Sequence, residues 1–156
     1  MFLLIKKQGT IRVCIDFRDI NQACPKDNYP TPYIDQIIDD CAGSEMFSFM
    51  DGFSSYNQIN ILPVDQPKTA FICPWGTFSY RKLPFGLNNA GATFRREMSY
   101  AFHDIKHIVQ PYLDDFPTHS SHREDHITHL RAIFIRCRNY KIRLNPHKCA
   151  FFIQSG

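Results

Sequence analysis

The stretch VQPYLDDFPT (109–118) places two adjacent carboxylates, Asp114 and Asp115, inside an otherwise apolar run, with Pro111 and Pro117 on either side. Its apolar residues favour buried strands and its paired aspartates favour a tight turn, so the stretch predicts a strand–turn–strand hairpin. Two ionised carboxylates held about 4 Å apart repel by roughly 4 kcal/mol at the effective dielectric of a protein surface. A divalent cation would offset that repulsion directly.

A third carboxylate is expected near the first two. Asp51 ends another predicted strand, FSFMD (47–51), and is followed by Gly52. Three hard oxygen donors suit Mg²⁺ and a phosphate substrate. The dipeptide alone leaves a second interpretation open, in which the paired aspartates are ordinary turn residues.

The composition sets the class of protein. The 156 residues fit one domain, and 44% hydrophobic residues with 14 Phe favour a globular fold with a sizeable core. The net charge of +3 is compatible with a polyanionic partner without indicating one. Six scattered cysteines without a CxxC pair predict reduced thiols in an intracellular protein. The opening MFLLIKK is too short for a signal sequence or a membrane span.

Helical and strand patterns alternate irregularly along the chain. We expect a hairpin over 2–17, an extended connection over 24–33, a strand near 56–62, two strands over 69–86 joined at PWG, and two closing strands over 141–153 about an Asn145-Pro146 turn. Helices are expected over 34–43, 89–105 and 122–140, the last with Ile127, Leu130, Phe134 and Cys137 on its apolar face. This mixture predicts an α+β fold with a mainly antiparallel sheet.

Five motifs then stand in an order and spacing similar to those of one enzyme family. They are RVCIDFRDIN (12–21), FSFMDGFSSYNQI (47–59), KTAF (68–71), LPFGLNNAGATF (83–94) and YLDD (112–115). On these motifs the chain resembles, over almost its whole length, the reverse transcriptases of long-terminal-repeat retrotransposons, closest to the Ty3/gypsy group of plant elements.

The resemblance implies a polymerase palm, an antiparallel sheet packed on helices, with part of the fingers and without a thumb. Residues 1–45 would be mainly fingers and connection, and residues 46–156 mainly palm, with a fingers insertion around 60–85. The implied activity is that of an RNA-directed DNA polymerase, a nucleotidyltransferase that extends a primer 3′-end with deoxynucleoside triphosphates on an RNA or DNA template. The missing thumb and ribonuclease H would belong to a longer Pol polyprotein, located in a cytoplasmic particle or the nucleus.

By position, Asp51, Asp114 and Asp115 match the catalytic, metal-binding triad of that family. The implied cofactor is a pair of Mg²⁺ ions, for which Mn²⁺ is a possible substitute. One ion would activate the primer 3′-hydroxyl, and the other would hold the triphosphate and stabilise the departing pyrophosphate.

The resemblance also implies contacts with the incoming nucleotide. Arg12 matches an arginine that contacts the triphosphate, for which a guanidinium is well suited. Lys6 or Lys7 matches a fingertip lysine, with a solvated hairpin lysine as an equal alternative. Tyr56 matches the bulky residue that excludes a 2′-hydroxyl. Phe85 and Gly86 match the loop beside the nucleotide pocket, although Phe85 could also be an ordinary core residue. The backbone amides expected to cradle the triphosphate are those around Phe53–Tyr56, which include Ser54 and Ser55.

Two further patterns receive a structural interpretation. His122, His126 and His129 share one face of a predicted helix, as zinc ligands can, but the helix is similar to the one that follows the aspartate hairpin in the family. Asp16, Arg18 and Asp19 are expected to form a salt-bridged surface.

The prolines depart from the family, which carries aliphatic residues at 111 and 117, and proline fits a central strand poorly. The alternative to an active polymerase is therefore a catalytically silent relict with at most weak nucleic-acid binding. The isolated fragment is expected to be weak or inactive. A metal-dependent nuclease would share the carboxylates but leaves Tyr56 and the motifs LPFG and KTAF unexplained.

Overall fold

The computed structural model describes residues 2–5, 9, 11–30 and 33–154, and the side chains of residues 2–5 and 12 lie outside this description. The chain divides into two compact units. The first unit comprises Met1–Asn28 and Tyr56–Ala92, and the second comprises Tyr29–Ser55 and Thr93–Gly156. The assignment of these two units to fingers and palm stays a prediction.

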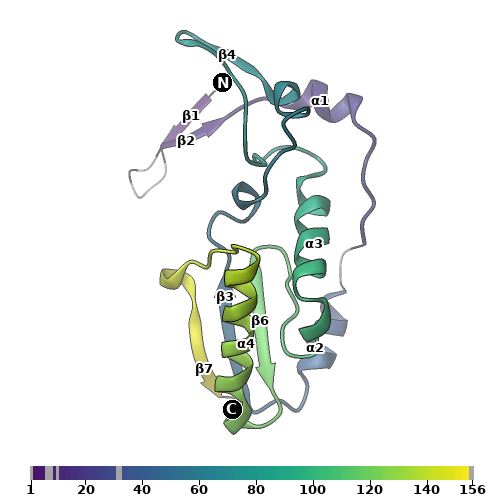
Figure 1. Cartoon of the computed structure of the whole chain (residues 1–156), viewed down its shortest axis with the longest axis vertical. Helices are drawn as coiled ribbons and strands as arrows, with labels where there is room; N and C mark the ends of the chain where they lie inside the picture. Colours follow the sequence, from purple (N-terminus) through teal and green to yellow (C-terminus); the bar gives the residue numbers. More distant parts are fainter. Residues whose placement is uncertain (1, 6–8, 10, 31–32, 155–156) are drawn as a thin grey trace. The chain divides into compact units, whose positions relative to one another are not determined.

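The first unit contains two short antiparallel hairpins and a short helix (Figure 1). Strand β1 (Phe2–Ile5) pairs with β2 (Ile11–Cys14), and β4 (Phe71–Cys73) pairs with β5 (Gly76–Phe78). Helix α1 (Arg18–Ala23) follows β2. Both predicted hairpins are confirmed, and the expected Arg18–Asp16 ion pair forms at 2.5 Å.

The strand expected near 56–62 is wrong. A 3-10 helix occupies Ser55–Gln58 instead, and the amide of Ile59 donates to the carbonyl of Tyr56 at 3.0 Å. Three of the seven residues of this segment, Asn57, Gln58 and Asn60, have amide side chains that favour local turns, so turns compete well with a strand. Within the described residues, the segment pairs through an isolated bridge between Asn60 and Lys82.

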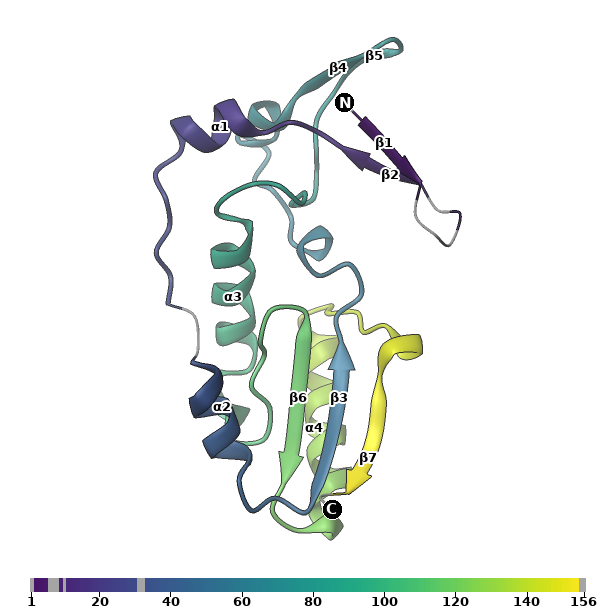
Figure 2. The same ribbon diagram turned by 180° about the vertical axis from the view of Figure 1, so that it is seen from behind.

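The second unit is built on a three-stranded antiparallel sheet in the order β6-β3-β7. The central strand β3 (Met46–Asp51) lies between β6 (Asp115–Ser120) and β7 (Ala150–Gln154). Helix α4 (His126–Asn139) crosses one face of this sheet, in front in Figure 1 and behind in Figure 2. Helices α2 (Ile34–Cys41) and α3 (Ala90–Ala101) lie on the β6 side (Figure 2), and the first three residues of α3 belong to the first unit.

The core of the second unit follows the expected period of two on β3. Met46, Ser48 and Met50 are buried, whereas Phe47 and Phe49 point to the other face. Within the helix expected over 89–105, the apolar residues at helical spacing form a stripe of which Phe94, Met98, Ala101 and Phe102 are buried and Ile105, beyond the end of α3, is half-buried.

The apolar stripe expected on α4 is partly wrong. Leu130 and Cys137 are buried, but Ile127 and Phe134 are 60% and 38% exposed. Their places in the core are taken by Ile133 and by His126, both fully buried. A histidine can enter the core here because both its ring nitrogens find hydroxyl partners on the sheet.

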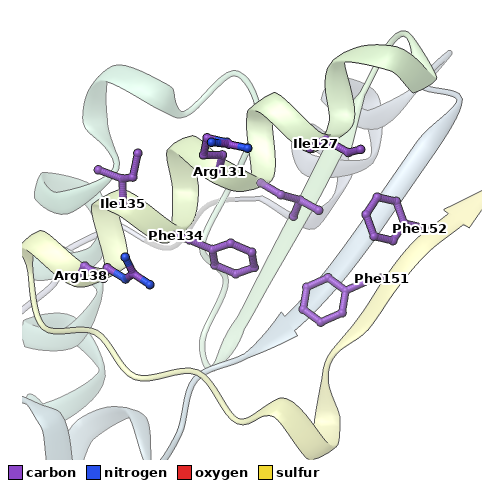
Figure 3. Close-up of a pocket in the computed structure, with 8 residues that line it drawn as sticks. Ile127, Arg131, Phe134, Ile135, Arg138, Phe151 and Phe152 are labelled. Carbon is purple, nitrogen blue, oxygen red and sulfur yellow. The ribbon is translucent and has the colours of Figure 1, made fainter.

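Ile127 and Phe134 instead line an open groove between α4 and β7 (Figure 3). The rings of Phe134 and Phe151 face each other across it, with their centroids 6.2 Å apart. Arg131 and Arg138 lie at its side, and no carboxylate lines it. The groove therefore lacks the acidic groups expected of the catalytic site.

The closing segment forms one strand rather than the expected two. Residues 141–144 contribute only a bridge between Leu144 and Gly52, and a 3-10 helix over Pro146–Lys148 precedes β7. No helix in the described part of the chain is long and apolar enough to cross a membrane.

Candidate active site

The ends of two paired strands bring the predicted carboxylates together in the second unit. Asp51, the last residue of β3, is the register partner of Asp115, the first residue of β6. The amide of Gly52 donates to the carbonyl oxygen of Asp114 at 2.7 Å and extends the same ladder by one residue. Directly opposed residues of an antiparallel pair point to the same face of the sheet, so Asp51 and Asp115 share a face.

A two-residue turn positions Asp114. Tyr112 and Asp115 exchange both backbone hydrogen bonds, at 2.8 and 2.9 Å, and Leu113 and Asp114 form the loop between them. Leu113 adopts a positive φ of 52°, which costs a leucine free energy and matches the hairpin turns that follow the twist of the strands. The predicted tight turn is confirmed, although the expected strand over 109–112 is reduced to isolated bridges at Val109 and Tyr112.

The carboxylates lie in an electrostatically unfavourable environment. Burial raises the pKa of Asp115, and the neighbouring negative charges of Asp51 and Asp114 raise it further. Oδ1 of Asp114 is buried and has no hydrogen-bond partner among the described residues. A buried carboxylate oxygen without a partner is costly, so this site favours a cation.

One cation is already present in the site and was not anticipated from the sequence. The ammonium group of Lys148 lies 3.1 Å from Oδ2 of Asp51, whose side chain is only 16% exposed. The charge of Lys148 also lowers the pKa of Asp115, against the larger opposing effects. Lysine in an Asn-Pro turn gives no periodic signal, so only the fold reveals this contact.

The three carboxylates match the implied Mg²⁺ ions in chemistry. Three carboxylates supply the hard oxygen ligands that Mg²⁺ prefers. Oδ1 of Asp114 has no hydrogen-bond partner among the described residues, so this oxygen is available to a metal ion. Within the described part of the chain, however, no three acidic, histidine or cysteine side chains already stand where they could hold one ion. The chemistry fits a divalent ion, and binding would require the side chains to adjust.

Gly52 packs closely against the residues that support the Asp114 turn. A Cβ atom at this position would lie 3.0 Å from Oγ of Ser55, 3.2 Å from the Phe116 ring and 3.3 Å from the Asp114 carbonyl oxygen. Such distances are tighter than ordinary contacts, so a side chain here would push on the Asp114 turn. The close approach explains why a glycine follows Asp51.

The two prolines disturb the sheet less than the sequence suggested. Strand β6 runs through Pro117 in register with Phe49 of β3, so the expected interruption is wrong. Backbone amides alternate along a strand, and those of Asp115 and His119 point to the 108–112 segment. The missing N–H of Pro117 therefore faces Gln110, whose own amide still donates to the Pro117 carbonyl at 3.2 Å.

Pro111 removes no bond from this hairpin. The amides of Gln110 and Tyr112 both point to β6, so the nitrogen of Pro111 between them points away. Because β6 is an edge strand of the three-stranded sheet, both prolines stand where proline is tolerated.

The residue expected beside the sugar, Tyr56, and those expected in the loop beside the nucleotide pocket, Phe85 and Gly86, lie in the first unit. The rings of Tyr56 and Phe85 meet edge to face, with their centroids 5.0 Å apart. Gly86 has a φ of 104°, and its carbonyl accepts a hydrogen bond from the Asn21 side chain at 2.7 Å. A Cβ at Gly86 would lie 3.3 Å from the Phe17 ring, so the loop requires glycine on two counts.

The remaining predicted contacts are distributed between the units. Arg12 lies on β2 opposite Leu4, and its side chain is outside the described part of the structure, as are Lys6 and Lys7 entirely. Phe53, Ser54 and Ser55 follow Gly52, just after the end of β3, in the second unit. Ser54 has a positive φ of 53°, and the buried Ser55 hydroxyl donates to the Gly52 carbonyl at 3.2 Å. Their roles toward a nucleotide stay predictions.

Two of the three histidines singled out from the sequence join a buried hydrogen-bond network. His126 lies 2.7 Å from Oγ of Ser48 through Nε2 and 2.7 Å from Oγ of Ser120 through Nδ1. Nδ1 of His129 lies 2.7 Å from the same Ser120 hydroxyl. These contacts tie α4 to β3 and β6, and they give the histidines a structural role.

The amino-acid sequence is similar to those of known proteins over almost its whole length. Residues 4–155 match the model of the family described as "Reverse transcriptase (RNA-dependent DNA polymerase)". The chain is 32% identical over 148 residues to the transposon Tf2-3 and Tf2-4 polyproteins of Schizosaccharomyces pombe, covering 94% of this chain and 11% of each polyprotein. It thus spans about a tenth of the length of these relatives.

Solved structures share the fold. Prototype foamy virus protease-reverse transcriptase superposes with a TM-score of 0.84 at 21% identity, over 96% of this chain and 20% of that one. A foamy viral protease-reverse transcriptase solved in complex with double-stranded DNA gives 0.87 at 20% identity, over 97% and 27%. Another, in complex with an RNA/DNA hybrid, gives 0.84 at 19% identity, over 96% and 20%.

Proposed function

Because the chain belongs to the reverse transcriptase (RNA-dependent DNA polymerase) family, we propose that it forms the catalytic centre of an RNA-directed DNA polymerase. Its substrates would be a primer 3′-end on an RNA or DNA template and deoxynucleoside triphosphates. The observation that carries this proposal is the pairing of Asp51 with Asp115 at the ends of β3 and β6, beside the buried, unpartnered oxygen of Asp114.

Asp51, Asp114 and Asp115 would hold the divalent ions. Bound Mg²⁺ would lower the pKa of the primer hydroxyl and neutralise charge on the triphosphate. The β3–β6 ladder fixes the backbone of all three carboxylates, since Gly52 binds the carbonyl of Asp114 directly. Such preorganisation matters because a catalytic group displaced by about 1 Å can cost roughly 100-fold in rate.

The other residues of the site bind and orient. Lys148 offsets part of the carboxylate charge, and it stands close enough to Asp51 to respond to any ion bound there. Arg12 would contact the triphosphate, and the ring of Tyr56, braced by Phe85, would exclude a 2′-hydroxyl. Support for nucleic-acid substrates comes from the foamy viral structures with an RNA/DNA hybrid and with double-stranded DNA.

The position of the prolines supports an active polymerase domain more than a catalytically silent relict. The sequence argument for a relict rested on the prolines and on the missing thumb, and of these two grounds the first is weakened because Pro117 leaves the ladder between β3 and β6 in register. The missing hydrogen bond falls on the 108–112 side, away from Asp51. The carboxylates therefore keep the backbone support that activity requires.

Primer extension tests the proposal in two formats. The 156-residue protein is assayed alone, where weak or no extension is expected because it spans about a tenth of its relatives. The matching segment of the Tf2-3 polyprotein is then replaced by this chain, and the purified chimera is given an RNA template, a DNA primer and the four deoxynucleoside triphosphates.

The chimera should extend the primer, and Asp114→Asn should reduce extension by roughly 100-fold to 1,000-fold, as loss of a charge-stabilising group does. Asp35→Asn on exposed helix α2 serves as the matched control and should extend normally. A folded chimera without activity would support the silent alternative, and equal activity of the two variants would refute the assigned role of Asp114.

A further inference from the structure

The ion pair between Lys148 and Asp51 joins a fixed carboxylate to a solvated ammonium group. Nζ of Lys148 lies 3.1 Å from Oδ2 of Asp51. The Asp51 side chain is 16% exposed and stands at the end of β3, where Asp51 is paired with Asp115. The Lys148 side chain is 65% exposed, and its ammonium group is carried by a flexible four-carbon stem. The lysine is therefore the partner that can leave this contact at the smaller cost.

The backbone beside Lys148 is held more firmly than its side chain. The amide of Asn145 donates to the carbonyl of Asp51 at 2.7 Å. The short helix Pro146–Lys148 follows, and the Asn145 side chain accepts a hydrogen bond from the His147 amide at 3.3 Å. The fold thus keeps one ammonium group beside the Asp51 carboxylate.

The charge of Lys148 also reaches the rest of the carboxylate cluster. It lowers the pKa of Asp115, against the larger raising effects of burial and of Asp51 and Asp114. A positive charge that favours an ionised carboxylate repels a second cation brought to the same group. Lys148 therefore acts on a divalent ion in two ways, because it pairs with Oδ2 of Asp51 and because its charge opposes that of the ion.

The side chains of the site have to move before they can hold one ion. In the described part of the chain, no three acidic, histidine or cysteine side chains stand where they could share a metal. The contact between the Lys148 ammonium group and Oδ2 of Asp51 is one interaction that such a rearrangement must break or share. An ammonium group left at ion-pair distance from a ligating carboxylate would lie close to the bound ion, and the two positive charges would repel.

We propose that Lys148 competes with the divalent ion for Asp51 and so weakens metal binding at the carboxylate site. This inference rests on the proposed metal site and adds to it a residue that sets its affinity. Binding of the ion separates Lys148 from Asp51, and removal of the lysine charge makes the ion bind more tightly.

The test is an EPR titration of the 156-residue protein with Mn²⁺ at pH 7.5, in which the signal of free Mn²⁺ gives the Kd. Lys148→Met keeps a long, unbranched side chain and removes the charge. Loss of one positive charge beside a divalent ion should lower the Kd about threefold to tenfold. Lys148→Arg keeps the charge and should not tighten binding. Lys141→Met, at an exposed lysine after α4, is the matched control and should leave the Kd unchanged.

The direction of the change separates this role from a structural one. A lysine that only supported the fold would weaken Mn²⁺ binding when replaced, whereas a competitor strengthens it. Equal or weaker binding by Lys148→Met, in a protein whose Asp114→Asn variant loses the ion, would overturn the inference and leave the metal site standing. Tightening by Lys148→Arg as large as that by Lys148→Met would also overturn it, because the charge would then be irrelevant. Absence of binding in both the wild type and Lys148→Met would overturn the metal site itself, and this inference with it.

Discussion

The ammonium group of Lys148 lies 3.1 Å from Oδ2 of Asp51, although 97 residues separate the two in the chain. The short helix Pro146–Lys148 and the hydrogen bond from the Asn145 amide to the Asp51 carbonyl, at 2.7 Å, bring them together. The charge of Lys148 lowers the pKa of Asp115, in opposition to burial and to Asp51 and Asp114. Lysine therefore moderates the repulsion among the carboxylates when no metal is bound.

Replacing Lys148 by Met should raise the pKa of Asp115 further, because the substitution removes the positive charge that lowers this pKa. Carboxyl ¹³C NMR titration of the metal-free protein measures this directly. Lys141→Met, an exposed lysine after α4, is the matched control and should leave the titration unchanged. An Asp115 titration that is the same in wild type and Lys148→Met would show that the lysine charge does not reach this carboxyl group.

The prolines give a prediction in which two similar substitutions behave differently. Pro117→Val restores an N–H that faces the Gln110 carbonyl, so it should stabilise the protein by about 0.5–1.5 kcal/mol, or raise Tm by roughly 1–6 °C. Pro111→Val restores an N–H that faces away from β6 and should change stability little. Thermal melting of both variants tests the register, which would be wrong if Pro111→Val gave the larger gain.

Stability should fall in mild acid because of His126. Burial lowers its pKa below the ordinary value of 6.5, helped by the nearby His129 and His119. The unfolded chain then binds the proton more readily, so the stabilising contribution is complete above about pH 6.5 and is lost as the pH falls toward the folded pKa. The loss per pH unit from one group is at most about 1.4 kcal/mol.

Urea unfolding between pH 5 and 8 measures this slope, and His126→Gln should flatten it although the variant is less stable at every pH. His147→Gln, an exposed histidine, should keep the wild-type slope. The raised pKa of Asp115 acts in the opposite direction, because it adds stability as the pH falls through the folded-state pKa of Asp115 toward the ordinary value of about 4. An unaltered slope in His126→Gln would contradict the buried network.

Much of this fold could be predicted from pattern. The period of two in β3 and the stripe of α3 each bury one face, so burial and sequence period agree. His126 could not be predicted as a core residue, since its burial depends on hydroxyls of Ser48 and Ser120 that lie on other strands. The face of α4 that carries His126 also carries Ile133, so Ile133 is buried and Ile127 and Phe134 are exposed.

The candidate site, like the fold, could be predicted only in part from the sequence. Asp51, Asp114 and Asp115 could be placed near one another because strand ends and a tight turn are local features. Lys148 could not, because its contact with Asp51 depends on the path of the chain after α4, where a predicted strand is replaced by turns.

Tyr56 should govern sugar selection in the polymerase chimera. Tyr56→Ala removes the ring that would meet a 2′-hydroxyl, so ribonucleotide incorporation relative to deoxyribonucleotide should rise by about tenfold or more. Tyr100→Ala, a 71% exposed tyrosine paired with Tyr140, is the matched control and should leave the ratio unchanged. Equal discrimination by Tyr56→Ala and wild type would remove the assigned role.

The central claim is that Asp51, Asp114 and Asp115 form a divalent-metal site, and paramagnetic broadening by Mn²⁺ in ¹H–¹⁵N spectra tests it most directly. Mn²⁺ should broaden the amides of Gly52 and Phe116 first, and excess Mg²⁺ should restore them. Asp114→Asn should abolish this broadening, whereas the exposed control Asp35→Asn should retain it. Equal broadening in Asp114→Asn and wild type, or none at either amide, would contradict the assignment.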